Sequence, residues 1–249
     1  MSVLALTRRG MADLRTSPAG VIPDLIAPTF LFLAALGIFG RLADLNNFST
    51  NDFTSFVVPF GMVQAAGLVG SGAGVNFGQD IRTGLFDRLL LMPVRRAALL
   101  ISAGIAATVR AAIAVVFLLL LGLALGARPT GPGNLLLSVG LAVAFGAVAA
   151  GWGLFVALRT GTSAAAPIMQ APIILLLVLG PAYAPRELLA GWLQPIAAVN
   201  PVSRLLEAAR APFLHGATWS STWPGLVSVA AMLLVLYAAA AWLLSRHNR

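Results

Sequence analysis

Long apolar runs separated by short polar segments are the feature of this chain that most limits what it can fold into. An α-helix needs about 17–25 apolar residues to cross a hydrocarbon core roughly 30 Å thick, and these runs have that length. The 249 residues are 59% hydrophobic and only 10% charged, with a mean hydropathy of +0.92, which is too apolar for a soluble globular domain. We therefore predict an all-α integral membrane protein.

The apolar runs predict six transmembrane helices within a single transmembrane domain, residues 1–249. The predicted spans are 21–40, 53–75, 103–127, 135–158, 164–183 and 225–244. The N-terminal segment, 1–20, mixes apolar residues with Arg and Asp, which predicts a helix lying in the membrane interface. In larger blocks, the prediction places spans 1 and 2 in 21–75, a polar loop in 76–96, spans 3 to 5 in 97–183, an extracellular segment in 184–224, and span 6 with a short tail in 225–249.

The arginines predict the orientation of these spans. All sixteen basic residues are Arg, and six spans place eleven of them on the side of the two termini. The other five are Arg41, Arg128, Arg186, Arg204 and Arg210. By the positive-inside rule, both termini are then cytoplasmic. The arginines are dispersed between apolar runs rather than gathered on one face with aromatic residues, so we expect no binding of nucleic acid.

Arg110 interrupts an apolar run that would otherwise extend over 97–127. If Arg110 lies near the cytoplasmic interface, 111–127 remain to cross the core, and we favour this interpretation. An intramembrane charge on a transport path is the alternative, and it is energetically costly.

The spans offer no catalytic constellation. The chain has no Cys, its two His residues lie outside the predicted spans, and Asp24 is expected to stand alone near the cytoplasmic end of the first span. An intramembrane enzyme needs a positioned nucleophile, base or metal set, so we expect neither an enzyme nor a metal site.

The second span carries a set of small residues. Gly67, Gly70, Gly72 and Gly74 leave a face poor in side chains, which predicts close approach of another helix. Gln64 and Gln170 are deep in apolar runs, and we expect them to form hydrogen bonds between helices.

The segment 76–96 reads NFGQDIRTGLFDRLLLMPVRR and is the most polar part of the chain's interior. A helix over 81–92, ended by Pro93, would carry one apolar stripe. The stripe consists of Ile81, Leu85, Leu89 and Met92. If this stripe rests on the membrane helices, Phe86 and Leu90 point away from it, beside Asp87. A projecting aromatic residue can dock into a partner's groove, and an interfacial helix without a partner is the alternative.

Two segments of the chain resemble the type-2 ABC exporter permeases. In the polar loop, the matching residues are Asp80, Gly84, Leu85, Asp87, Arg88, Leu89, Leu90, Met92, Pro93 and Arg95. After the fifth span, they are Asn200, Pro201, Leu206, Glu207, Ala208 and Arg210. The resemblance covers essentially the whole chain, and its length and compact loops are most similar to daunorubicin-type multidrug efflux permeases.

This resemblance implies a coupling helix, a motor subunit and a second permease copy. The residues expected to couple to a P-loop ABC ATPase are Asp80, Ile81, Gly84, Leu85, Phe86, Asp87, Leu90 and Pro93. It also implies a dimer, likewise expected to be homomeric, in the bacterial inner membrane. ATP and Mg are expected on the partner ATPase and no cofactor on this chain, because a sequence without Lys cannot contain the phosphate-loop Lys.

The segment 185–216 is too apolar for a free loop and too short for a span, which predicts two short helices dipping into the outer leaflet. Arg204, Glu207 and Arg210 are spaced by three, so Glu207 can be flanked by both guanidinium groups on one helical face. The resemblance implies a re-entrant extracellular element here. Together with Asn200 and Pro201, the three charged residues are expected to gate substrate exit or to support the structure.

The prediction for the whole chain is the membrane subunit of an ATP-driven exporter. Its expected substrate is a hydrophobic or amphipathic small molecule, such as a drug or antibiotic, reached from the surrounding membrane lipids. Two alternatives stay open: export of a lipid-linked glycan or other lipid conjugate, and a non-transport membrane scaffold or immunity protein.

Overall fold

The computed structural model describes residues 22–41, 52–90 and 96–246, and every regular element in these ranges is a helix. Four helices are long and apolar enough to cross a membrane, and two apolar helices are shorter. The long ones are α3 (Phe53–Arg82), α5 (Arg96–Ala124), α6 (Pro132–Thr160) and α10 (Trp219–Arg246), and the shorter ones are α2 (Ile22–Phe39) and α7 (Ala166–Val178). The chain is thus a multi-pass, all-α membrane protein, and the interfacial helix predicted for 1–20 lies outside the described residues.

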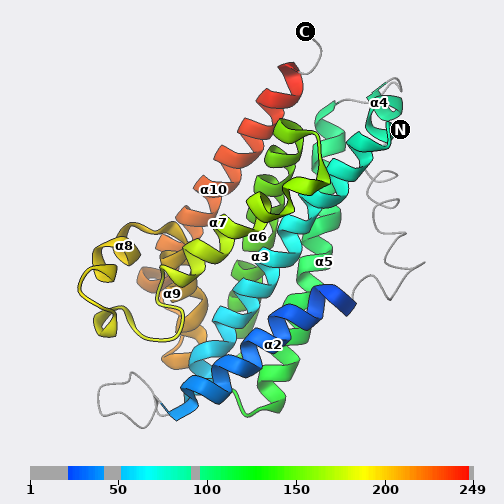
Figure 1. Ribbon diagram of the computed structural model, residues 1–249. Coiled ribbons are helices and arrows are strands. Elements are labelled where there is room, and N and C mark those ends of the chain that lie inside the picture. The colour runs from blue at the N-terminus through cyan, green and yellow to red at the C-terminus, as the bar shows by residue number, and fades with distance from the viewer. Residues whose placement is uncertain (1–21, 42–51, 91–95, 247–249) are drawn as a thin grey trace.

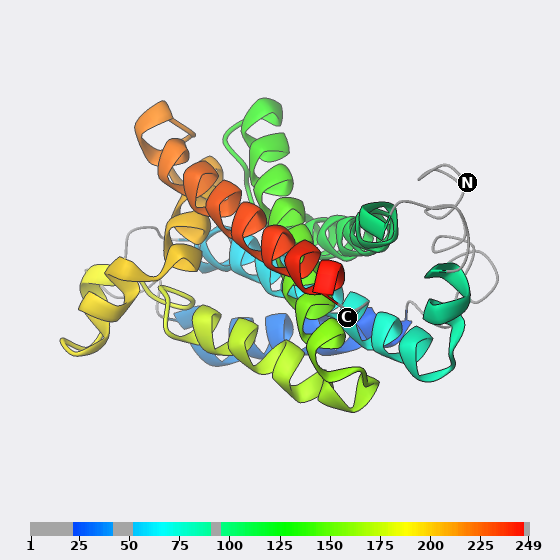
Figure 2. The same ribbon diagram turned by 90° about the horizontal axis from the view of Figure 1, so that it is seen from above.

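The helix α3 is the centre of the bundle. It packs against α2, α5, α6 and α7, and against the short helix α9 (Pro201–Leu214). In the view from above, α2 and α10 lie on opposite sides of α3 (Figure 2). The short helix α4 (Leu85–Leu90) lies at the same end of the bundle as the C-terminus, whereas α9 lies toward the other end (Figure 1).

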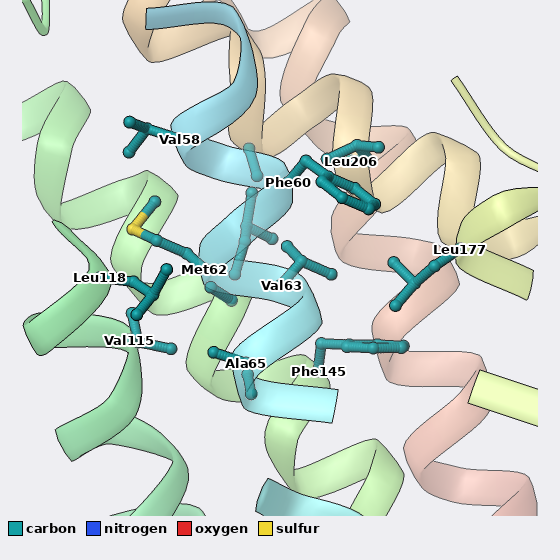
Figure 3. Packing of buried hydrophobic residues seen from close by; sticks show 14 of the residues in the cluster. Val58, Phe60, Met62, Val63, Ala65, Val115, Leu118, Phe145, Leu177 and Leu206 are labelled. Atoms are coloured by element: carbon teal, nitrogen blue, oxygen red, sulfur yellow. The ribbon is translucent and has the colours of Figure 1, made fainter. Parts of the chain in front are cut away.

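The core is built on the apolar side chains of α3. Figure 3 shows Val58, Phe60, Met62, Val63 and Ala65 of this helix reaching neighbours on four others. Those neighbours are Val115 and Leu118 of α5, Phe145 of α6, Leu177 of α7 and Leu206 of α9, and all ten residues are at most 2% exposed. In lipid, helices gain little from the hydrophobic effect, so this dense van der Waals packing supplies much of the association energy.

The small residues of α3 allow one very close helix contact. A Cβ atom at Gly70 would collide with the backbone oxygen of Gly146, and one at Gly74 with that of Gly153. Both partners belong to α6, so the prediction of a close helix neighbour along this face is confirmed. Gln64 is buried, and its Oε1 atom has no hydrogen-bond partner.

Several helix boundaries differ from the predicted spans. α3 continues seven residues beyond the predicted end at 75, and α5 begins seven residues before the predicted start at 103. α7 ends at Val178, before the Gly180–Pro181 turn, rather than at 183. Hydropathy marks where the lipid core ends, but a helix continues into water until a backbone feature stops it.

Arg110 lies fourteen residues before the last residue of α5, Ala124, so about 21 Å of helix follows it. Its placement near the cytoplasmic interface stays a prediction. Asp24 does not stand alone, since its Oδ2 lies 3.7 Å from the Nη2 of Arg110. An ion pair between α2 and α5 lowers the cost of both charges in this setting.

Candidate coupling and exit sites

The polar segment 76–96, called the inner segment after its predicted side, contains the end of one helix and a second short helix. The sequence predicted a single helix over 81–92. Asp80 and Ile81 belong to the last turn of α3, which ends at Arg82. The next helix, α4, has only six residues and carries Leu85, Phe86, Asp87 and Leu90. Pro93 lies outside the described residues.

Gly84 is the reason for this break. Its φ of +70° lies in the left-handed region, which side chains with a Cβ disfavour. The Thr83 hydroxyl donates to the carbonyl of Gln79 at 3.1 Å, which satisfies one of the open carbonyls at the end of α3. The chain therefore changes direction between α3 and α4. Residues before and after Gly84 no longer lie on one continuous helical face, so the predicted apolar stripe is broken.

Phe86 does not project, contrary to the prediction. It is 1% exposed and packs edge-on against Phe77 of α3, with ring centroids 5.2 Å apart. Leu85 and Ile81, which were expected to rest on the membrane helices, are only half-buried. Because the turn at Gly84 rotates α4, Phe86 anchors the helix, and Arg88 is an exposed side chain that a partner can reach.

The loop between α6 and α7 lies beside the end of α3. The hydroxyl of Ser163 donates to the Oε1 atom of Gln79 at 3.2 Å. A Cβ atom at Gly78 would come within 2.7 Å of the carbonyl carbon of Thr162. The inner end of α3 is thus held close to a second inner loop, next to the connection that leads to α4.

The segment 185–216, called the outer segment after its predicted side, contains three short elements. They are a 3-10 turn, η4 (Arg186–Leu188), then α8 (Leu193–Val199) and α9. Asn200 and Pro201 lie at the junction of α8 and α9, and each has a structural role there. Its Oδ1 accepts from the backbone N–H of Val202 at 2.9 Å, which caps α9, and Pro201 occupies the first turn. Its Nδ2 donates to the carbonyl of Leu176 at 2.6 Å, so the same residue ties α9 to the end of α7.

Arg210 is fully buried at the meeting point of three elements. Its Nε donates to the carbonyl of Phe56 at 2.9 Å, Nη1 to Pro181 at 2.9 Å, and Nη2 to Ala182 at 3.0 Å. The guanidinium also lies 3.7 Å above the ring of Phe56. Arg210 therefore joins α9 to the start of α3 and to the turn after α7.

Glu207 forms its ion pair outside α9, contrary to the prediction, although its charge still acts favourably on the guanidinium of Arg210. It forms an ion pair with Arg186 of η4, whose Nε donates to Oε1 at 3.1 Å. Arg204 makes a single long hydrogen bond, 3.4 Å from its Nη2 to the carbonyl of Ala198. The spacing within α9 could not identify Arg186, because it lies twenty-one residues earlier in the chain.

These outer residues line a cavity of about 300 Å³. One stripe of α9 forms a wall, with Arg204, Glu207, Ala211 and Leu214 at helical spacing. The first turn of α10 closes the opposite side with Ser220 and Ser221. The sequence pattern marked the charged residues of α9 but not the cavity between them and α10.

The comparisons with known proteins identify the family of this chain. A family described as "ABC-2 type transporter" matches residues 1–214. The chain belongs to the ABC-2 type transporter family. This permease is also similar to the "Daunorubicin resistance ABC transporter permease protein DrrB1" of Streptomyces coeruleorubidus, with 27% identity over 246 residues, which cover 96% of this chain and 84% of that protein. The resemblance seen in the sequence is thereby confirmed.

Family membership sets the general role of the permease. Proteins of this family are the membrane subunits of ABC transporters, so association with an ABC ATPase is implied. Both comparisons describe transporter or permease proteins rather than ATPases.

Proposed function

We propose that this chain is the membrane-spanning subunit of an ATP-driven exporter of hydrophobic or amphipathic small molecules, such as a drug or antibiotic. The single observation that carries the proposal is the family match over residues 1–214, with a drug-resistance permease as a relative. The small helix α4 lies at one end of the bundle and the charged segment lies toward the other. We assign the first end to the ATPase and the second to substrate exit.

The proposed topology has six spans, with α2 and α7 as the two short ones and both termini in the cytoplasm. α2 is about 27 Å long, which is close to the thickness of the hydrocarbon core. The α4 end faces the cytoplasm of a bacterial cell, and α8 and α9 form the re-entrant extracellular element. The permease acts as a homodimer, and each copy binds one ATPase, which holds ATP and Mg.

Coupling in this proposal runs through α4. The helix connects the end of α3 directly to the approach to α5, two of the longest helices in the bundle. Movement of a bound ATPase at α4 is passed to α3 through the Phe86–Phe77 contact. Asp80, Ile81, Gly84, Leu85, Asp87, Leu90 and Pro93 remain in the proposed coupling segment, with Phe86 as its anchor rather than its projecting contact.

The exit side runs through the outer segment. Asn200 and Arg210 tie α9 to the ends of α7 and α3, and Glu207 ties it to η4. Pro201 begins α9, Arg204 lies on its cavity side, and movement of this unit opens the outer end. Buried Arg210 limits how far α9 can move, because its donors would lose three carbonyl partners.

The test is purification of the tagged permease from its native membrane with Arg88→Glu as the coupling variant. We expect a P-loop ATPase to accompany the wild-type protein in near-equal amount and to be lost with the variant. Arg246→Glu is the matched control, because Arg246 is exposed at the same end of the bundle and stacks on Trp242, away from α4. Loss of the ATPase from both variants would mean that charge, not α4, determines association.

Substrate class is tested on the purified complex. Stimulation of ATP hydrolysis by daunorubicin, and its ATP-dependent movement across proteoliposomes, are the expected results. Stimulation by lipid-linked sugars instead would favour a lipid-conjugate exporter. A permease that purifies without any ATPase and acts without ATP would contradict the proposal and favour a scaffold or immunity protein.

A further inference from the structure

The outer cavity has the composition of a ligand site rather than of a packing defect. Its size, about 300 Å³, lies at the lower end of the range for small-molecule sites. Pro185, Leu214 and Pro224 provide apolar surface, while charged and hydroxyl side chains lie on the same walls. The side chains of Glu187, His215 and Ser220 are exposed, so the cavity opens to the surface.

The arginines of this cavity differ in how fully their donors are used. Arg210 is satisfied by its three carbonyls, and Arg186 is paired with Glu207. Arg204 has only the 3.4 Å hydrogen bond to Ala198 and, within the described residues, no ion pair. Arg204 is therefore the guanidinium with donors left for a ligand.

The balance of charge in the cavity is positive. Three arginines and two glutamates line it, which leaves a net charge of +1 with His215 neutral. Glu187 is exposed at the rim, where solvent and salt screen its charge. The first turn of α10 also lines the cavity, with the partial positive charge of a helix start, the hydroxyl of Ser220, and the hydroxyl of Ser221, which donates to the carbonyl of Thr218.

We propose that this cavity binds the anionic head of an amphipathic molecule, with Arg204 as the cation and with the attached chain lying on Pro185, Leu214 and Pro224. Phosphate is the chemistry that fits best, because a planar guanidinium can meet two of its oxygens and the exposed hydroxyl of Ser220 can meet a third. The phosphate can come from a lipid headgroup or from a soluble alkyl phosphate. The site belongs to the permease alone and does not depend on the proposed export.

The test measures binding to purified full-length permease in an uncharged maltoside detergent, by isothermal titration. The probes are dihexanoyl phosphatidylglycerol, hexyl phosphate and, as the zwitterionic comparison, dihexanoyl phosphatidylcholine. We expect the anionic probes to bind and Arg204→Gln to weaken them about tenfold or more, as loss of a charged hydrogen bond implies. Arg128→Gln, an exposed arginine outside the cavity, is the matched control and should change affinity less than about twofold.

Two further variants separate a ligand site from a structural role. Leu214→Trp fills the cavity without a change of charge, so it should abolish binding. Glu187→Gln removes the negative charge at the rim and should strengthen binding. Arg204→Gln should leave the apparent melting temperature unchanged, because it removes only one long hydrogen bond.

Binding of both anionic probes shows recognition of the phosphate itself, and binding of phosphatidylglycerol alone identifies a lipid headgroup as the source. Equal binding of phosphatidylcholine, affinity that is the same in Arg204→Gln, or equal losses in Arg204→Gln and Arg128→Gln would overturn the proposal. The assay contains neither ATPase nor ATP, so its failure and a failure of export are separate results.

Discussion

The outer segment and the inner coupling segment are held to the same bundle by different kinds of contact. The outer segment uses buried polar side chains, chiefly Arg210 and Asn200, which donate to backbone carbonyls of other elements. The inner helix α4 has six residues and is anchored by the Phe86–Phe77 contact. Directional hydrogen bonds define one position, whereas an apolar contact on a short helix tolerates adjustment. In the proposed function, this difference suits an outer segment that moves as one unit and a helix α4 that follows a moving partner.

The most severe test of this comparison is Arg210→Met. The variant leaves three carbonyls without their charged donor in a buried site, and we expect a loss of about 3–5 kcal/mol in stability. The measurement is the apparent melting temperature of the purified permease by size-exclusion chromatography after heating. Arg128→Met is the control, because Arg128 is exposed. Equal melting temperatures in both variants would remove the basis for calling the outer unit rigid.

Asn200→Ala should have the next largest effect. It removes the cap of α9 and the 2.6 Å hydrogen bond to Leu176, for which we expect a loss of about 2 kcal/mol. Asn200→Ser is the comparison, because it keeps a cap acceptor without a charge but loses the amide donor, and it should lose less stability than Ala. If the two variants melt together below wild type, the hydrogen bond to α7 rather than the cap carries the effect.

Phe86→Ala should act locally. Truncation of a core Phe costs about 3–5 kcal/mol when the site cannot open, but α4 can detach alone, so we expect a global loss of only about 1 kcal/mol. Hydrogen exchange should accelerate over α4 and remain at the wild-type rate over α9. A fall in melting temperature as large as that of Arg210→Met would show that α4 is part of the main core, and the contrast between the two regions would fail.

Glu207→Gln should have the smallest effect. The pair with Arg186 is about one-third exposed, and pairs of that kind contribute about 0–1 kcal/mol. The variant should melt within a degree or two of the wild type at low salt and identically at high salt, where the pair is already screened. A loss of stability comparable to that of Asn200→Ala would show that the Glu207–Arg186 pair is a main contact holding the outer segment.

The sequence predicted elements well where one physical signal decided them. The span 135–158 lies within α6, because uniform hydropathy is followed by Gly161 in the left-handed conformation, which ends the helix. Prediction from the sequence failed where a feature depended on contact between two distant segments. The orientation of Phe86 depends on the turn at Gly84 and on Phe77, and the pairing of Asp24 with Arg110 joins residues eighty-six positions apart.

The charged residues of α9 show the division most clearly. Their type and spacing alone marked them as a functional or structural set, because charges in so apolar a chain must be compensated. Only the tertiary structure decided the partner of each residue. Arg210 donates to three backbone carbonyls, and Glu207 pairs with Arg186. Arg204 keeps unused donors beside a cavity. Composition and periodicity determine the class of the protein and its helices, since they act through local transfer and backbone energies. Which polar groups meet depends on distances between helices, and a one-dimensional pattern contains no such distances.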